Sequence, residues 1–285
     1  MAQSTRDIKR RIKSISSIMQ ITNAMELVSS AKLIKARERL IKTRPYYHTV
    51  LKNMHQTFNI VGDHHPLLKE REINRSLYII ISDDRGLAGG YNNNIVRLVE
   101  DETKGREKEV SLILIGTKSI EHFRGKEYKI RKKFTGITEE PLYSDAEEIG
   151  ELALNLYKNY AVDEIKIAFT RFINTMTHEP EIRQLLPHVN FWEVEDRNNN
   201  VIDFEPSPEE VLDYLIPKYL NSCIYGALIE ASCSEQASRK VAMEVASENA
   251  RELIDELKIS YNRARQSAIT TELNEIVTSA EVLKD

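Results

Sequence analysis

The sequence predicts an α/β protein in which a long antiparallel coiled coil, formed by the N- and C-terminal helices, carries an inserted α/β domain. Three observations predict this fold. Both ends of the chain lack helix breakers over long distances: the first proline is Pro45, the first glycine is Gly62, and only Gly226 follows Pro217. Apolar residues recur at helical spacing in both ends. Between the ends, short β-branched runs alternate with helical patterns.

The N-terminal helix is predicted over residues 1–60. Its apolar positions are separated mostly by three or four residues in alternation, which is the spacing of a coiled-coil seam. They are Ile8, Ile12, Ile15, Met19, Met25, Val28 and Ala31.

Residues 75–195 are predicted to form an inserted Rossmann-like α/β domain with a largely parallel sheet. Its predicted strands are continuous apolar runs at 77–81, 110–115 and 165–169. Helical patterns lie between them near 93–103, 117–124 and 144–160. A further strand, in antiparallel orientation, fits residues 188–195.

The C-terminal helix is predicted over residues 207–285. Ser207 or Pro208 is suited to begin it, acidic residues follow in the first turn, and Pro217 is expected to kink it. Its stripe comprises Ala246, Ala250, Leu253, Leu257, Tyr261, Ala264 and Ala268, followed by Ile269, Leu273, Ile276, Ala280 and Leu283.

The two predicted helices differ in length. At about 1.5 Å per residue, residues 3–58 span about 85 Å and residues 209–283 about 110 Å. If the helices pair outward from the inserted domain, the C-terminal helix extends beyond its partner. Its tip then carries apolar side chains without an intramolecular partner, a feature typical of a binding surface. The tip residues are Ile269, Leu273, Ile276, Val277 and Leu283.

The stretch Ser82–Asn94, SDDRGLAGGYNNN, follows a predicted strand and resembles a phosphate-binding loop. It has neither the P-loop spacing and lysine nor the G-x-G-x-x-G of a dinucleotide site. A tight strand-to-helix turn with glycines at positive φ is favoured over an anion site. Gly116-Thr117-Lys118-Ser119 lacks the upstream P-loop glycine, so it is interpreted as a helix start capped by Thr117. Adjacent Asp83 and Asp84 are interpreted as turn formers rather than a metal pair.

Composition excludes several classes of protein. The formal net charge is -4, which argues against nucleic-acid binding, and no apolar run reaches the ~20 residues of a membrane span. Cys223 and Cys233 are too far apart on one helix to bridge, which is typical of a reducing compartment. No catalytic, cofactor or metal motif occurs, so we expect a non-catalytic protein without a cofactor. The N-terminus lacks a signal-peptide core, and a cytosolic protein is expected.

Two charged or polar groups are candidate partner contacts. Residues 1–44 hold eleven Lys or Arg against three Asp or Glu, with the densest cluster at Lys9, Arg10, Arg11 and Lys13. A solvated helix face and a nucleic-acid arm are alternatives to a surface that faces an acidic protein. Near the tip, Arg265 and Gln266 are either ordinary exposed side chains or hydrogen-bonding partners for carboxylates.

The chain closely resembles the γ subunit of the bacterial-type F1 ATP synthase. The stretches that carry the resemblance are IMQITNAMELVSSAKLIKARE at 18–38, SDDRGLAGG at 82–90, FINTMTHEPEIRQLLP at 172–187 and ASENARELIDELKISYNRARQSAITTELNEIV at 246–277. They are spread over essentially the whole chain, and the two terminal motifs together are highly specific.

The resemblance implies a central rotor shaft that couples ion-driven rotation to conformational change at the catalytic β subunits. Its coiled coil would turn inside a hexamer of α and β subunits, with the tip in a mostly apolar sleeve. Its α/β domain would contact ε and the ring of c subunits, at the cytoplasmic face of a bacterial membrane. Catalysis would occur on the hexamer rather than on this chain, which would meet the membrane only through the c ring.

The match also implies individual contacts. Arg265 and Gln266 would meet a loop of β, and Met25 and Arg85 would lie near its acidic lever segment. From their charge, Lys9, Arg10, Arg11 and Lys13 are expected to contact the same lever.

Some positions depart from the family pattern. Ala88 stands where cysteine is common, Asp84 is an addition, and Thr278-Ser279 replaces a glycine pair near the C-terminus. Two further hypotheses remain: a self-contained α/β nucleotide-binding domain with coiled-coil arms, and a homodimeric coiled-coil adaptor.

Overall fold

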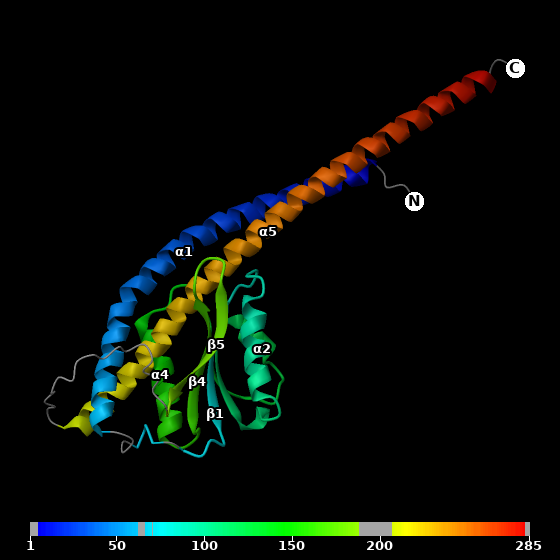
Figure 1. The fold of residues 1–285 in the computed structure, drawn as a ribbon. Helices are drawn as coiled ribbons and strands as arrows, with labels where there is room; N and C mark the ends of the chain where they lie inside the picture. Colours follow the sequence, from blue (N-terminus) through cyan, green and yellow to red (C-terminus); the bar gives the residue numbers. More distant parts are fainter. Residues whose placement is uncertain (1–4, 62–65, 70, 188–206, 283–285) are drawn as a thin grey trace. The chain divides into compact units, whose positions relative to one another are not determined.

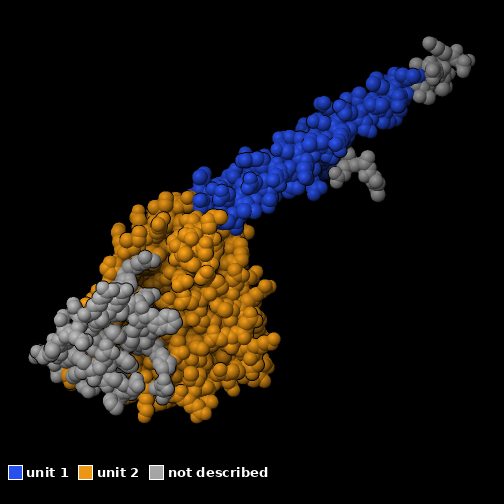
Figure 2. Space-filling view, in the orientation of Figure 1, with its two compact units in different colours: residues 1–29, 240–285 blue, residues 30–239 orange. Residues whose placement is uncertain are grey.

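A computed structural model of the chain describes residues 5–61, 66–69, 71–187 and 207–282. It divides into two compact units: residues 1–29 with 240–285, and residues 30–239 (Figure 2). The long helices α1 (Thr5–Val61) and α5 (Pro208–Val282) each contribute to both units (Figure 1). The predicted fold class is therefore confirmed, while the sequence-based domain boundaries stay a prediction.

The larger unit contains a five-stranded sheet with the order β3-β2-β1-β4-β5. Its strands are β1 (Ser76–Ile81), β2 (Val110–Ile115), β3 (Lys129–Phe134), β4 (Glu164–Phe172) and β5 (His178–Leu186). The first four are parallel, and β5 runs antiparallel to β4. The remaining elements are α2 (Tyr91–Thr103), η2 (Glu107–Glu109), α3 (Thr117–His122) and α4 (Tyr143–Lys158).

Both faces of the sheet are covered by helices (Figure 1). On one face, odd-numbered residues of β1 such as Ile79 pack with α4 and with the parts of α1 and α5 in this unit. On the other face, Tyr78 and Ile80 pack with α2 and with Phe123, which follows α3. All six residues of β1 are buried, as are all six of β2, because a parallel strand inside the sheet has no solvent-facing side. This explains why their sequences are continuous apolar runs.

The two edge strands are the elements that the sequence did not reveal. β3 has the sequence KIRKKF, and most of its side chains are at least partly exposed, as is typical of a charged edge strand. β5 is the antiparallel strand of the sheet and contains Pro180, a residue that sheets tolerate at an edge. The strand expected at 188–195 lies outside the described residues.

The long helices begin and continue largely as predicted. Ser207 Oγ accepts a hydrogen bond from the backbone N–H of Glu210 at 3.2 Å, which makes Ser207 the N-cap of α5. The helix then continues through Pro217 as a single element. Cys223 and Cys233 are not joined by a disulfide, as the spacing predicted, and both are buried.

Gly116 allows the closest backbone approach in the sheet region. It has φ +93°, and a Cβ there would lie 2.4 Å from the carbonyl oxygen of Ser82. Gly105 has a similar φ of +82°, but a Cβ there would meet nothing within 4 Å. Substitutions at these two glycines therefore distinguish the cost of backbone strain, present at both, from the cost of a steric clash, present only at Gly116.

We expect Gly116→Ala to lower the free energy of unfolding by about 3 kcal/mol or more, because strain and a backbone clash add. Gly105→Ala should cost only about 1–2 kcal/mol, from strain alone. Urea unfolding followed by circular dichroism measures both. Equal losses in the two variants would contradict the close approach.

Candidate functional site

The loop after β1 is held by its own carboxylates. Asp83 accepts hydrogen bonds from the backbone N–H groups of Arg85 at 2.8 Å and Gly86 at 2.7 Å. Gly86 and Gly89 have positive φ, as predicted for a tight turn, whereas Gly90 does not. Two amides of this turn are thus already engaged by an acidic side chain rather than available to a phosphate.

The start of α3 is occupied in the same way. Asp84 accepts from the backbone N–H of Thr117 at 3.0 Å and from its hydroxyl at 2.9 Å. The next two amides, of Lys118 and Ser119, donate to the Asp83 carbonyl and to the Ser82 hydroxyl. The expectation that Thr117 caps this helix was wrong, because Gly116 is the N-cap residue and Asp84 supplies the carboxylate. A phosphate therefore finds no available amide at this helix start.

Asp84 also accepts bonds from Gly136 N–H at 2.8 Å and Thr138 Oγ1 at 3.0 Å, so it joins three loops. Asp83 and Asp84 point to different partners, which agrees with their interpretation as turn formers. Among the described residues, no group of three His, Cys, Asp or Glu side chains is arranged to hold a metal ion.

A buried charge cluster connects this loop to α5. Arg239 donates through Nη1 to Glu235 Oε1 at 2.6 Å and through Nη2 to Asp83. Its Nε also donates to the Gly86 carbonyl at 3.2 Å. Asp83, Glu235 and Arg239 are 1%, 2% and 6% exposed. Burial, and then the nearby charge of Asp83, raise the pKa of Glu235 to about 7, although Arg239 opposes the shift.

Arg85, a predicted partner contact, lies at the rim of this loop. Its Nη2 is 2.7 Å from Glu139 Oε2, and Glu139 also pairs with Lys32 of α1. The hydrogen bond from Lys32, together with both positive charges, lowers the pKa of Glu139. The Arg85 side chain is still 68% exposed, so it is both anchored and accessible.

The smaller unit is an antiparallel helix pair with small, partly polar contact residues. Thr22 and Ser247 share a buried hydrogen bond of 2.6 Å between their hydroxyls, which fixes the register. The other residues buried here are Ile8, Ser29, Met243, Ala250 and Ile254. The predicted seam was therefore wrong at Val28, which is 54% exposed, and at Leu253, which is 47% exposed. Ala31, in the larger unit, is exposed too, whereas Ser29 and Ile254 occupy contact positions that the apolar pattern missed.

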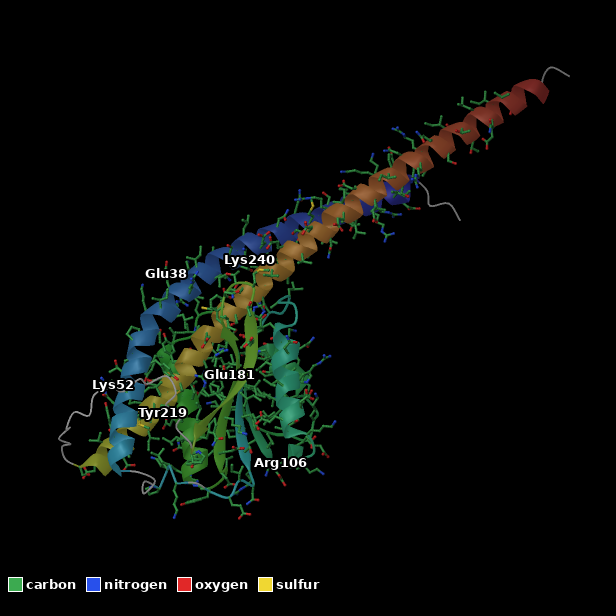
Figure 3. The ribbon with its side chains drawn as sticks, in the orientation of Figure 1. Glu38, Lys52, Arg106, Glu181, Tyr219 and Lys240 are labelled. Carbon is green, nitrogen blue, oxygen red and sulfur yellow. The ribbon has the colours of Figure 1, made fainter. Side chains whose placement is uncertain are left out.

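The register leaves the end of α5 without a partner helix in the described part of the smaller unit. Continued from Thr22 and Ser247, it places Ile8 level with about residue 261. Beyond that level the end of α5 extends alone (Figure 3). There Ile269, Leu273, Ile276 and Val277 are 48%, 56%, 65% and 58% exposed. Their spacing puts them on one face of the helix. Leu283 lies outside the described residues.

The polar candidates in the smaller unit are exposed as well. Arg265 and Gln266 precede Ile269 by four and three residues, so they lie on the same face of α5, one turn closer to the helix pair. The basic cluster of Lys9, Arg10, Arg11 and Lys13 is exposed on the first turns of α1, where Arg10 pairs with Asp7. Met25 is half-buried. The structure thus gathers these residues into one unit and places Arg85 in the other.

Sequence reasoning missed Glu235 and Arg239. The available signal was their context: a Glu and an Arg four residues apart in ASCSEQASRK, a stretch dominated by small residues. Such a stretch indicates a closely packed helix face, on which charged side chains must be paired.

The pKa of Glu235 makes stability depend on pH. Because the folded-state pKa lies above that of the unfolded chain, the native protein binds the extra proton, and this stabilisation is lost as the pH rises through about 7. We expect the unfolding free energy of the parent to fall by about 2 kcal/mol more than that of Glu235→Gln between pH 5.5 and pH 8, because only the parent ionises at this position. Urea unfolding at both pH values measures the difference. Glu244→Gln, at an exposed site on α5, is the control and should show no such change.

Comparison with known proteins agrees with this architecture. The family model described as ATP synthase matches residues 4–283. The ATP synthase gamma chain of Alkaliphilus metalliredigens is 47% identical, and the alignment covers 100% of both chains. The sodium-ion-specific ATP synthase gamma chain of Acetobacterium woodii is 42% identical over 99% of this chain and 100% of the relative.

Solved structures share the fold. One is a chain from the OSCP, F1 and c-ring part of the Euglena gracilis mitochondrial ATP synthase. Its TM-score is 0.69 at 18% sequence identity, and the match covers 98% of this chain and 94% of that chain. Another, from the central stalk and c ring of the Tetrahymena thermophila mitochondrial enzyme, has a TM-score of 0.63, 24% identity, and coverage of 80% and 99%. The chain belongs to the family of ATP synthase gamma chains, the non-catalytic central shaft of that enzyme.

Proposed function

We propose that this gamma chain transmits torque through two surfaces of the smaller unit: the tip of α5 and the basic cluster at the start of α1. The exposed apolar face of the tip is the observation that carries the proposal. Exposing such a face to water is unfavourable, and enclosure in an apolar sleeve formed by α and β subunits would remove it from water.

The chemistry of the tip suits a surface that must turn. Apolar contacts are non-directional, so rotation between two apolar surfaces breaks few specific bonds. Ile269, Leu273 and Ile276 lie on one side of the helix, so each β subunit would meet a different face as the shaft rotates. A shaft that binds β conformations unequally shifts their populations, which is how rotation would drive the catalytic sites.

The polar residues supply directional contacts near the tip and at the start of α1. Arg265 can offer two parallel N–H groups to a carboxylate, and Gln266 can donate and accept. Lys9, Arg10, Arg11 and Lys13 place four positive charges on two helical turns, and Met25 lies further along the same helix. We propose a loop of β as the partner of Arg265 and Gln266, and an acidic segment of β as that of the basic cluster.

In the larger unit, Arg85 is proposed as a further contact to β, because Glu139 holds its guanidinium at the surface. The α/β domain is proposed to contact the ε subunit and the c ring. No helix among the described residues is long and apolar enough to cross a membrane. Membrane association at the cytoplasmic face would then be peripheral and would occur through the c ring.

The tip proposal predicts a loss of assembly without a loss of folding. We expect Leu273→Ala with Ile276→Ala to weaken binding to the α–β hexamer by roughly thirtyfold, or about 2 kcal/mol. The unfolding free energy of the isolated chain should change by less than about 0.5 kcal/mol, because both side chains are exposed. Reconstitution with titrated hexamer measures the affinity. The control is Leu142→Ala with Met176→Ala, at exposed sites on the α/β domain, and an equal effect there would contradict the proposal.

The basic cluster is proposed to restrain ATP hydrolysis by holding the acidic segment of β. We expect Arg10→Gln with Arg11→Gln to raise hydrolysis by the reconstituted complex up to about fivefold, since an exposed ion pair contributes up to about 1 kcal/mol. The difference should vanish near 1 M salt, where screening is strong. Lys35→Gln with Arg37→Gln removes the same charge elsewhere on α1 and serves as the control. Unchanged hydrolysis in the first double variant would refute the restraint.

A further inference from the structure

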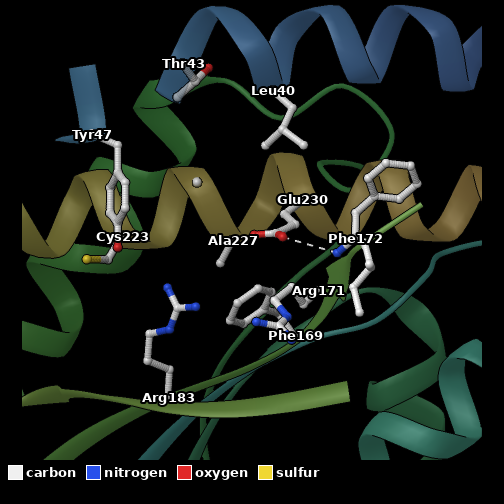
Figure 4. A pocket seen from close by; sticks show the side chains of 12 residues that line it. Leu40, Thr43, Tyr47, Phe169, Arg171, Phe172, Arg183, Cys223, Ala227 and Glu230 are labelled. Atoms are coloured by element: carbon white, nitrogen blue, oxygen red, sulfur yellow. Dashed lines mark hydrogen bonds between the residues drawn. The ribbon is translucent and has the colours of Figure 1, made fainter. Parts of the chain in front are cut away.

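A cavity of about 500 Å³ lies within the larger unit, between α1, α5 and the β4–β5 pair (Figure 4). The charged side chains of its wall find partners within the chain. Arg171 lies 3.3 Å from Glu179, and Arg183 lies 3.0 Å from Glu181. Glu230 of α5 accepts a hydrogen bond of 3.2 Å from a backbone N–H of β4. These side chains therefore give the cavity no preference for an ionic ligand.

Leu87, in the loop after β1, combines two unfavourable features instead. Its φ is +58°, in the left-handed region that a bulky side chain rarely adopts. It is also 63% exposed, so burial within the chain does little to offset the backbone strain. Glycine or asparagine would adopt the same backbone more easily. Neither the conformation nor the exposure of this leucine is thus explained by packing inside the larger unit.

Tyr160 shows what explains such a conformation elsewhere in the larger unit. It has a φ of +53° and directly follows the C-cap residue of α4. Its N–H donates to the Tyr157 carbonyl at 3.2 Å, and the Ala161 N–H donates to the Leu156 carbonyl at 2.9 Å. This pair of bonds is the Schellman motif, which requires a left-handed residue after a helix. Leu87 lies between a strand and a helix N-terminus, so no such motif requires its conformation.

The backbone on both sides of Leu87 is fixed by the rest of the larger unit. The Gly86 N–H donates to Asp83 at 2.7 Å, and the Gly86 carbonyl accepts from Arg239 Nε at 3.2 Å. On the other side, Ala88 is only 2% exposed. These anchors keep the leucine side chain at the surface in one place. Strain that the surrounding structure maintains in this way is typical of functional positions.

We propose that Leu87 is an apolar anchor that inserts into an apolar depression on a β subunit. Enclosure there would remove its exposed side chain from water, and a side chain fixed in advance loses little conformational entropy on binding. The same loop carries Arg85, so the inference rests on the proposed contact of Arg85 with β. The depression would have an apolar centre and, at its rim, an oxygen that accepts a hydrogen bond from Arg85.

Leu87→Asn separates an anchor from a structural residue, because asparagine is of similar size and tolerates positive φ. We expect the melting temperature of the isolated full-length chain to be maintained or raised. Affinity for the α–β hexamer, measured by reconstitution with titrated hexamer, should fall about tenfold, since an apolar contact is lost. A lower melting temperature with unchanged affinity would mean that Leu87 serves folding alone, and would overturn the proposal.

Two further variants make the test specific. Leu87→Met keeps an apolar side chain and should bind within about twofold of the parent. Tyr160→Asn changes an exposed left-handed residue at the opposite end of the parallel sheet, and should leave the affinity unchanged. Equal weakening in Tyr160→Asn would overturn the anchor. If the parent binds the hexamer and Leu87→Asn binds equally well, the anchor alone is refuted, whereas a parent that fails to bind refutes the proposed function too.

Discussion

The larger unit depends most on the buried ion pairs that the guanidinium of Arg239 makes. This guanidinium lies between two buried carboxylates, Asp83 and Glu235, and also donates to the carbonyl of Gly86. Removing one member of such a cluster leaves an uncompensated buried charge, which typically costs about 3–5 kcal/mol. Through Asp83 the cluster fixes the loop after β1, and Asp84 then fixes the start of α3 and the loop after β3. One cation on α5 and the two adjacent loop carboxylates thus connect the loops at this end of the sheet.

The two aspartates of this loop also oppose phosphate binding at the glycine-rich turn. Anion-binding loops present unpaired backbone amides, whereas here Asp83 and Asp84 accept from those of Arg85, Gly86 and Thr117. The chain supplies the negative charge itself. The loop is consequently anchored to the α/β domain through its own carboxylates, and the side chain of Arg85 stays exposed at its surface.

In the smaller unit the decisive constraint is the register of the helix pair. Small residues let the helices approach closely, and the hydroxyl pair of Thr22 and Ser247 permits one register. That register leaves the last turns of α5 unpaired within the described part of the unit. A hydroxyl pair in the middle of the helices therefore determines which apolar side chains stay exposed, and so which surface is offered to a partner.

The long helices and the buried strands could be predicted from the sequence, because each depends on local propensity or on a face fully removed from water. The two long helices, β1, β2, β4, the α/β class and the exposed tip residues are of this kind. The edge strands β3 and β5 could not be predicted, since their solvated side chains carry no continuous apolar pattern. The seam was misplaced at Val28 and Leu253 because the contact positions include Ser29 and Thr22, whose burial depends on a partner helix more than 200 residues away.

The sequence by itself determined the class, the family resemblance and the candidate contacts, because these depend on which residues occur and at what spacing. The candidate contacts are Arg265, Gln266, Lys9, Arg10, Arg11 and Lys13. Only the tertiary structure decided the pairing of Arg239 with Asp83, the engagement of the loop amides, and the backbone that holds Leu87 at the surface. Each of these joins residues distant in the chain, and the free energy of a buried charge or a strained backbone depends on neighbours that spacing along one segment does not specify.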